Sequence, residues 1–227
     1  MSRWSVVPDK FGNQTLEDAD ENVSMLLASG KEWRPFRPRP EDFEWSDIAI
    51  GASRIPRFGG QLSPKFDLDT HSNYVLAQHL CLAHDLARDG GVTDPEVLLA
   101  ILLHDAEEPL GGLGDPVGPV KHSPFFRVWF KAYFAPILNA IAMKAGINPT
   151  LLQGHLHVKT WDKAAYAVEN WHLRGIRNGD VPALPIGYRR RSEDKMAIWS
   201  TAHAHYVWLA HLDKALFNVQ AEREANG

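Results

Sequence analysis

The longest uninterrupted apolar run in this chain, Val97 to Leu103, leads directly into His104 and Asp105. A helix that is apolar on every side is buried, so this run is predicted to deliver an imidazole and a carboxylate into the protein interior. Burying these groups is unfavourable unless they are paired or bind a metal. Thr93–Glu96 forms a capping box with proline in the first turn, which predicts the helix start. If the helix continues, Glu108 lies four residues after His104 and on the same face.

The remaining pattern also predicts helices. Apolar residues recur with helical spacing in four further segments, namely 70–89, 124–145, 149–174 (with a break near 155–157) and 192–217. Pro136 is expected to kink the second of these, and Gly146 to end it. No alternating apolar run bounded by turns requires a strand. The sequence therefore predicts an all-α protein.

Domain organisation follows from these segments. Residues 1–45 are predicted to be an N-terminal arm with a short helix, which a capping signal at Thr15–Asp18 would begin before Gly30. The arm also contains Lys31–Glu41, whose three prolines and three arginines favour an irregular path. Residues 46–178 are predicted to form the core, and residues 179–227 a loop and a C-terminal helix packed on the same domain.

Composition narrows the class of protein. The 227 residues are 44% hydrophobic, 23% charged and carry a formal net charge of −4, which is ordinary for a globular protein with a substantial core. No long basic run indicates a nucleic-acid surface, and no apolar run reaches the ~20 residues of a membrane span. The single cysteine, Cys81, excludes an intramolecular disulfide framework and fits a reducing compartment. The N-terminus lacks the apolar segment of a signal peptide, so a cytoplasmic location is expected.

Four side chains offer a set of metal ligands. His71, His104, Asp105 and Asp162 provide two imidazoles and two carboxylates from three predicted helices. Such a set suits a borderline divalent cation, and facing helices of a bundle commonly build such sites. We expect one divalent transition metal (Mn, Co, Fe or Zn, with Mg also possible).

These residues carry a resemblance to a known family. The order His71, His104–Asp105, Asp162 resembles the H…HD…D signature of HD-domain phosphohydrolases. The segment HDAEEPLGGLGDPVGPVK at 104–121 is similar to the corresponding segment of bacterial 5′-deoxynucleotidases, and phage dATP triphosphohydrolases share the pattern. The resemblance covers roughly residues 48–174. It implies an HD-domain helical bundle with a mononuclear metal site in its core.

The resemblance also implies roles for individual residues. Glu108 or Asp115 would orient or deprotonate the attacking water, and one of them would protonate the leaving oxygen. Arg57 and Lys121 would offset the phosphate charge. Phe58 would line the pocket for the base, at a position where those nucleotidases usually have tryptophan.

The implied function is release of phosphate from (deoxy)nucleoside 5′-monophosphates. A homo-oligomer is the expected assembly, and neither a nucleic acid nor a membrane is expected as a partner. Three alternatives stay open. The first is a deoxynucleoside triphosphate triphosphohydrolase, for which Arg54 and Lys65, or an arm folded over the pocket, would add positive charge. The second is hydrolysis of an alarmone or a modified nucleotide. The third is a nucleotide-binding regulator without turnover.

A second His–Asp pair, His84–Asp85, is interpreted as structural. Arg88 lies three residues after Asp85, so an ion pair along the helix is expected, and no acidic glycine-rich segment follows. His155 and His157 are likewise assigned to the predicted helix break.

Overall fold

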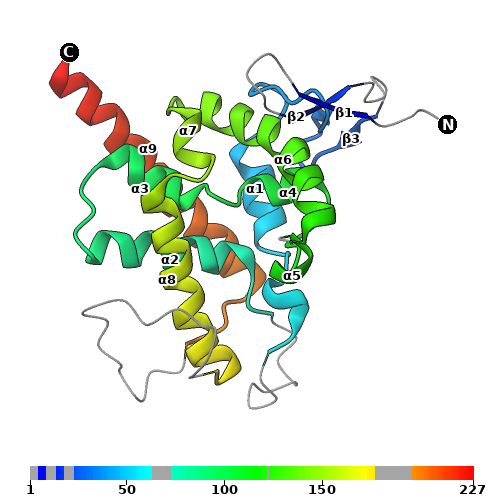
Figure 1. Cartoon of the computed structure of the whole chain (residues 1–227). Helices are drawn as coiled ribbons and strands as arrows, with labels where there is room; N and C mark the ends of the chain where they lie inside the picture. The colour runs from blue at the N-terminus through cyan, green and yellow to red at the C-terminus, as the bar shows by residue number, and fades with distance from the viewer. Residues whose placement is uncertain (1–4, 9–13, 18–22, 63–72, 122, 177–195) are drawn as a thin grey trace.

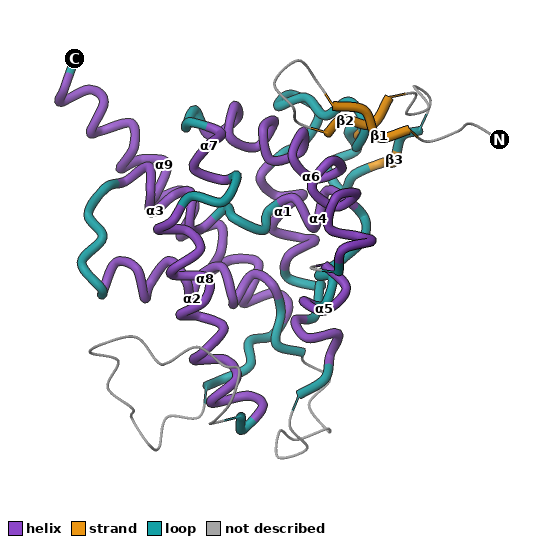
Figure 2. Tube along the Cα trace, viewed as in Figure 1, coloured by secondary structure: helices purple, strands orange, loops and turns teal. Residues whose placement is uncertain are grey.

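The computed structural model describes residues 5–8, 14–17, 23–62, 73–121, 123–176 and 196–227. Most of them are helical, which confirms the predicted all-α class (Figures 1 and 2). The helices are α1 (Trp45–Ala52), α2 (Leu76–Asp89), α3 (Pro95–Leu102), α4 (Glu107–Gly111), α5 (Gly118–Lys121), α6 (Pro124–Ala145), α7 (Pro149–Leu152), α8 (Leu156–Glu169) and α9 (Thr201–Asn226). A 3-10 turn, η1 (Arg57–Gly60), follows α1, and a π-helical turn, η2 (Asn170–Arg174), follows α8.

Helix α3 lies at the centre of the packing. It contacts α2, α8 and α9, while α2 also packs on α8 and α9 (Figure 1). The side chains from Leu99 to Leu103 are fully buried, and each such leucine or isoleucine contributes about 1.5–3 kcal/mol by leaving water. The prediction that this apolar run is an interior helix is therefore confirmed.

Helix α3 begins within one residue of the predicted start and has the predicted proline in its first turn, but its cap is Asp94 instead of the predicted Thr93–Glu96 box, and its end also differs. Asp94 caps the helix, because its Oδ1 accepts hydrogen bonds from the backbone N–H groups of Glu96 and Val97 at 2.9 and 3.1 Å. The helix ends at Leu102, and a turn carries the chain into α4. His104 and Asp105 thus lie in a turn between two helices, and the expectation that they share one continuous helix with Glu108 is wrong.

Two close approaches fix α4 against its neighbours. A Cβ atom added at Gly51 of α1 would lie 2.6 Å from Cβ of Pro109, and one at Gly111 would lie 2.5 Å from Cε1 of Phe134 in α6. Only glycine permits these distances. The short helix that carries Glu107 and Glu108 is therefore held tightly between α1 and α6.

The other predicted helix signals agree with the structure in part. Ser123 caps α6, Gly146 ends it with a φ of 70°, and the break near His155 separates α7 from α8. The C-terminal helix begins after Ser200, which caps it, and not at the predicted residue 192, because residues 196–200 are not helical. It continues to Asn226, beyond the expected end at Phe217. It packs on α1, α2 and α3, so the C-terminal segment belongs to the same folded body. Among the described residues, no helix is both long and apolar enough to cross a membrane.

The N-terminal arm contains hairpins instead of the predicted short helix. Strand β1 (Ser5–Pro8) pairs with β2 (Gln14–Glu17), and β3 (Met25–Leu26) pairs with β4 (Glu32–Trp33), drawn in orange in Figure 2. Tertiary packing explains the second hairpin: Trp33 is fully buried and its Nε1 donates to the Leu110 carbonyl at 2.8 Å. The anchoring of Trp33 outweighs the weak local helix signal, so that prediction is wrong.

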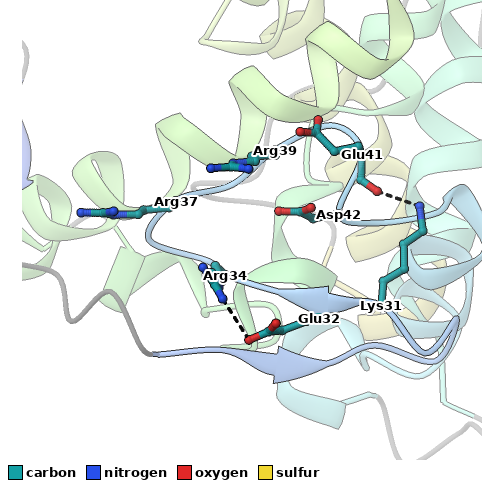
Figure 3. A pocket seen from close by; sticks show the side chains of 7 residues that line it. All are labelled: Lys31, Glu32, Arg34, Arg37, Arg39, Glu41 and Asp42. Atoms are coloured by element: carbon teal, nitrogen blue, oxygen red, sulfur yellow. Dashed lines mark hydrogen bonds and ion pairs between the residues drawn. The ribbon is translucent and has the colours of Figure 1, made fainter.

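The charged residues of the arm surround a cavity of their own. Seven side chains line a cavity of about 450 Å³, namely Lys31, Glu32, Arg34, Arg37, Arg39, Glu41 and Asp42 (Figure 3). Lys31 Nζ donates to the Glu41 carbonyl at 2.7 Å, and Arg34 Nη2 lies 3.4 Å from Glu32 Oε1. Two basic residues of this segment are paired with carboxylates, Arg34 with Glu32 and Lys31 with Glu44.

Candidate metal centre

Four side chains from distant parts of the chain meet beside the end of α3. His79 comes from α2, His104 and Asp105 from the turn after α3, and Asp162 from α8. The Nε2 atoms of His79 and His104 lie 3.2 Å apart. Asp162 Oδ1 lies 3.3 Å from His79 Nε2 and 3.6 Å from His104 Nε2, and Asp105 Oδ2 lies 3.4 Å from His104 Nε2. Tetrahedral ligand atoms about 2.0–2.2 Å from one ion lie about 3.3–3.6 Å from each other. The ligand atoms of His79, His104 and Asp105 all lie within 4.8 Å of one another, and Asp162 adjoins the two imidazoles.

The tautomers of the two imidazoles are set by their other nitrogen atoms. His104 Nδ1–H donates to the Ile101 carbonyl at 2.7 Å, because a carbonyl can only accept. His79 Nδ1–H donates to the Glu169 carboxylate at 2.6 Å. In their neutral forms both rings therefore turn an unprotonated Nε2 toward the other, and two lone pairs at 3.2 Å repel each other. A proton or a cation between them removes this repulsion, and imidazoles held in this way are typical metal ligands.

The first predicted histidine, His71, lies outside the described residues, so its predicted role as a ligand is not tested. Among the described residues, it is His79 that lies beside His104. His79 is fully buried and precedes His104 by 25 residues. The sequence contained a signal for it: His79 falls three residues after Leu76 and four before Ala83, on the apolar face of the helix. A polar side chain on that face needs a partner, and His71 in the first predicted turn does not.

Glu169 supports the site from behind and was not predicted from the sequence. It is fully buried at the end of α8, and its Oε1 accepts from Tyr74 Oη at 2.9 Å and from His79 Nδ1 at 2.6 Å. Burial alone would raise its pKa, but the charges of His79 and Arg57 hold the pKa of Glu169 below its ordinary value. The carboxylate therefore stays ionised and fixes the orientation of the His79 ring.

Arg57 reaches the site from η1 and pairs with Asp115. Its Nη1 donates to Asp115 Oδ2 at 2.9 Å and lies 3.9 Å from Asp105 Oδ2, while its Nη2 lies 3.8 Å from Glu169 Oε2. Although burial opposes its charge, Glu169 and Asp115 keep the pKa of Arg57 above its usual range. The predicted acid and the predicted phosphate-binding residue are thus neighbours.

Phe58 lies next to Arg57 in an unusual backbone conformation. Its φ of 57° is in the left-handed region, which aromatic residues rarely adopt. Its ring centroid lies 6.1 Å from that of Tyr166, and the guanidinium groups of Arg57 and Arg174 lie 5.6 and 5.1 Å from its centre. Such outliers concentrate at functional sites, and here the strained residue adjoins the charged cluster.

Lys121 and two glutamates form the other side of the cluster. Lys121 Nζ donates to Glu108 Oε1 at 3.0 Å and lies 3.5 Å from Asp105 Oδ1. Burial and the charge of Asp105 raise the pKa of Glu107 to about 8, and the same two causes raise the pKa of Glu108 well above its ordinary value. The second oxygen atoms of both glutamates, and that of Glu169, are buried without a hydrogen-bond partner among the described residues. With a pKa of about 8, Glu107 can hold and release a proton near neutral pH, and the raised pKa of Glu108 favours its protonated form.

The cluster as a whole has more acids than permanent cations. Of the described residues, only Arg57 and Lys121 supply a fixed positive charge in these contacts. Six carboxyl groups surround them, those of Asp105, Glu107, Glu108, Asp115, Asp162 and Glu169. The raised pKa values of Glu107 and Glu108 favour their protonated forms, so the negative charge is carried mainly by the other four carboxyl groups. A divalent cation between the two imidazoles would offset the charge of these carboxylates, so the donor set and the electrostatics both fit a metal.

Comparison with known proteins identifies a relative whose own activity is uncharacterized. No family model matches the chain. An uncharacterized protein of Rhodobacter capsulatus is 35% identical over 96 residues, which are 42% of this chain. The match spans 45% of the length of that relative.

Proposed function

We propose that this protein is a metal-dependent phosphohydrolase of the HD-domain type, which releases phosphate from (deoxy)nucleoside 5′-monophosphates. The metal would be one divalent transition metal of the Mn, Co, Fe or Zn class, with Mg as a further possibility. The observation that carries the proposal is the pair of facing Nε2 atoms of His79 and His104, 3.2 Å apart, with both Nδ1–H groups already donated elsewhere.

His79, His104, Asp105 and Asp162 would hold the metal. When bound, a divalent cation acts as a Lewis acid toward a phosphoryl oxygen and lowers the pKa of water. This ligand set follows the order H…HD…D along the chain, with His79 in the place first given to His71.

Glu108 is the proposed general acid–base. In the reaction a water oxygen forms a new P–O bond, the ester P–O bond breaks, and a proton passes from the water to the leaving oxygen. The carboxyl group of Glu108 is fully buried, holds Lys121 through Oε1 and leaves Oε2 without a partner among the described residues. Its raised pKa suits a group that accepts a proton and returns it.

Arg57 and Lys121 would bind the phosphoryl group, and Asp115 would position Arg57. Arg57 presents a planar fork suited to phosphate oxygens, and Asp115 holds that fork in place through the 2.9 Å contact with Nη1. Lys121 adds a second positive charge on the side of Glu108. Phe58, whose ring centre lies 5.6 Å from the Arg57 guanidinium, and Tyr166 next to Phe58 would offer an apolar surface for a nucleobase.

The charge of the site favours a monophosphate over a triphosphate. A phosphate monoester carries about −1.5 to −2 near neutral pH, and both permanent cations of the cluster already pair with a carboxylate. A triphosphate brings more negative charge and would need cations besides Arg57 and Lys121, such as Arg174 beside Phe58. In the arm, Lys31 and Arg34 already pair with Glu44 and Glu32.

The metal is tested by quantifying bound metal in wild-type protein and in Asp105→Ala. We expect the variant to lose one equivalent, because Asp105 lies 3.4 Å from His104 Nε2 within the ligand set. Asp94→Ala is the matched control, since this carboxylate caps α3 and lies outside the cluster. Equal metal content in wild type and Asp105→Ala would refute the proposed centre.

The reaction is tested by incubating the metal-loaded protein with dAMP or with dATP and separating the products. Inorganic phosphate from dAMP is the expected result. Tripolyphosphate from dATP without phosphate from dAMP would instead establish a triphosphohydrolase. Nucleotide binding with no product from either substrate would favour a regulator without turnover.

A further inference from the structure

A second group of metal-ligating side chains lies between α2 and α9, apart from the residues of the first centre. His84 and Asp85 belong to α2, and His211 comes from α9. One ligand atom of each lies within 4.8 Å of the others. Asp85 Oδ1 is 3.4 Å from His84 Nδ1 and 3.3 Å from His211 Nε2, and the two imidazole rings meet edge to face at 5.4 Å. The ion pair predicted from the sequence also exists, because Arg88 Nη1 lies 3.1 Å from Asp85 Oδ1.

The backbone fixes the tautomer of His211. Its Nδ1–H donates to the Val207 carbonyl at 2.9 Å, one helical turn earlier. Nε2 therefore faces Asp85 Oδ1 at 3.3 Å, where either its own proton or a bound cation joins the imidazole to the carboxylate. Ligating histidines are commonly held in this way, through an Nδ1–H bond to a backbone carbonyl.

The distances fit one small divalent ion. Tetrahedral zinc sites hold nitrogen and oxygen ligands about 2.0–2.1 Å from the ion, which places the ligand atoms about 3.3–3.4 Å from each other. The two separations measured from Asp85 Oδ1 are 3.3 and 3.4 Å. The third separation, between the nitrogen atoms of His84 and His211, is within 4.8 Å, so the two rings would close on the ion.

We propose that His84, Asp85 and His211 form a second metal site that binds one zinc-like divalent cation and joins α9 to α2. Two imidazoles and one carboxylate are a suitable donor set for Zn²⁺ or Co²⁺, and water would complete the coordination. The role of the site is structural, since it connects the C-terminal helix with the helix that carries His79. The proposal does not depend on the phosphohydrolase function.

The surroundings allow an ion to enter and Arg88 to give way. The side chains of Asp85 and His211 are 38% and 22% exposed, so solvent reaches the site. Arg88 also pairs with Asp89, whose Oδ1 lies 3.1 Å from Arg88 Nη2. The guanidinium can therefore keep one carboxylate partner when a cation takes the other.

The test counts bound zinc in the full chain after metal removal with a chelator, reloading with Zn²⁺ and gel filtration. We expect His211→Ala to lower the zinc content by one ion per chain, both in the wild-type background and in the Asp105→Ala background that disables the first centre. His84→Asn should give the same loss and decides the question if His211→Ala fails to fold. His203→Ala is the control, because this exposed histidine of α9 lies outside the cluster.

A second measurement separates an ion from a simple hydrogen-bonded cluster. Zn²⁺ should raise the unfolding temperature of Asp105→Ala but not that of Asp105→Ala with His211→Ala, because only a folded site binds the ion. A zinc content unchanged by either His211→Ala or His84→Asn would overturn the second site. That outcome is distinct from a failure of the first centre, in which Asp105→Ala alone would leave the zinc content unchanged.

Discussion

Replacing Glu169 with glutamine should weaken metal binding at the first centre without removing any of its ligands. In the native protein the Glu169 carboxylate accepts the Nδ1–H of His79 at 2.6 Å and the hydroxyl of Tyr74 at 2.9 Å. It thereby orients the His79 ring and increases the electron density on Nε2, the atom that faces His104. Glutamine preserves the shape and one acceptor oxygen but removes the negative charge.

The magnitude follows from the position of this carboxylate. Hydrogen bonds to an ionised acceptor are roughly twice as strong as neutral ones, and partners behind a metal ligand typically contribute about 10- to 100-fold to metal affinity. We therefore expect the dissociation constant to rise by about 10- to 100-fold, or about 1.4–2.7 kcal/mol. Folding stability should fall as well, by about 1–3 kcal/mol, because the amide N–H₂ group would face Arg57 Nη2, which lies 3.8 Å from Glu169 Oε2.

The assay is competition between the protein and a chromophoric chelator for Co²⁺, with the proteins in the His211→Ala background so that only the first centre is read. Tyr74→Phe is the matched control, because it removes one donor to the same oxygen and keeps the charge of Glu169. That control should change the affinity by less than about threefold. A folded Glu169→Gln protein with the affinity of its parent would refute the argument that this carboxylate tunes His79.

Three further predictions concern catalysis and packing. Glu108→Gln should lower kcat by about 10²–10⁴-fold, the usual contribution of general acid–base catalysis, with unchanged metal content; near-normal steady-state turnover would exclude Glu108 from that role. Gly111→Ala should destabilise the fold by about 1–3 kcal/mol in urea unfolding, because the new methyl group would lie 2.5 Å from Cε1 of Phe134. An unchanged urea midpoint of unfolding would contradict the tight packing of α4. Trp33→Phe should lower the free energy of unfolding by about 1–3 kcal/mol in the same assay, because the Leu110 carbonyl loses the hydrogen bond from Trp33 Nε1–H at 2.8 Å. Wild-type stability of the variant would mean that this carbonyl finds another donor.

Much of the helical framework could be predicted from the sequence, because its signals are local. Asp94, Ser123 and Gly146 mark the helix ends that the structure contains. The apolar run before His104 correctly predicted a buried helix that brings an imidazole and a carboxylate to the interior. The spacing of apolar residues, the helix caps and the helix-ending residues act within a few positions of the chain. They can therefore be identified without knowing which other helices pack against the segment.

The members of the candidate site were predicted less completely than the helices. Every predicted member that the structure describes lies in or beside one cluster, namely Arg57, Phe58, His104, Asp105, Glu108, Asp115, Lys121 and Asp162. His79 and Glu169 were missed, and the activity itself remains a proposal. Glu169 carried no local signal, because a glutamate near the end of a helix is ordinarily exposed to solvent.

Only the tertiary structure decided which distant side chains meet. The packing of α2 on α3 and α8 brings His79 to His104 across 25 residues and to Glu169 across 90. The packing of α9 on α2 brings His211 to Asp85 across 126 residues and so turns an ordinary helical ion pair into a candidate metal site. The physical reason is that local sequence sets where a helix starts, ends and buries its apolar face. The rotation and crossing of one helix against another depend on side chains from the whole core, which must fill the same interior together.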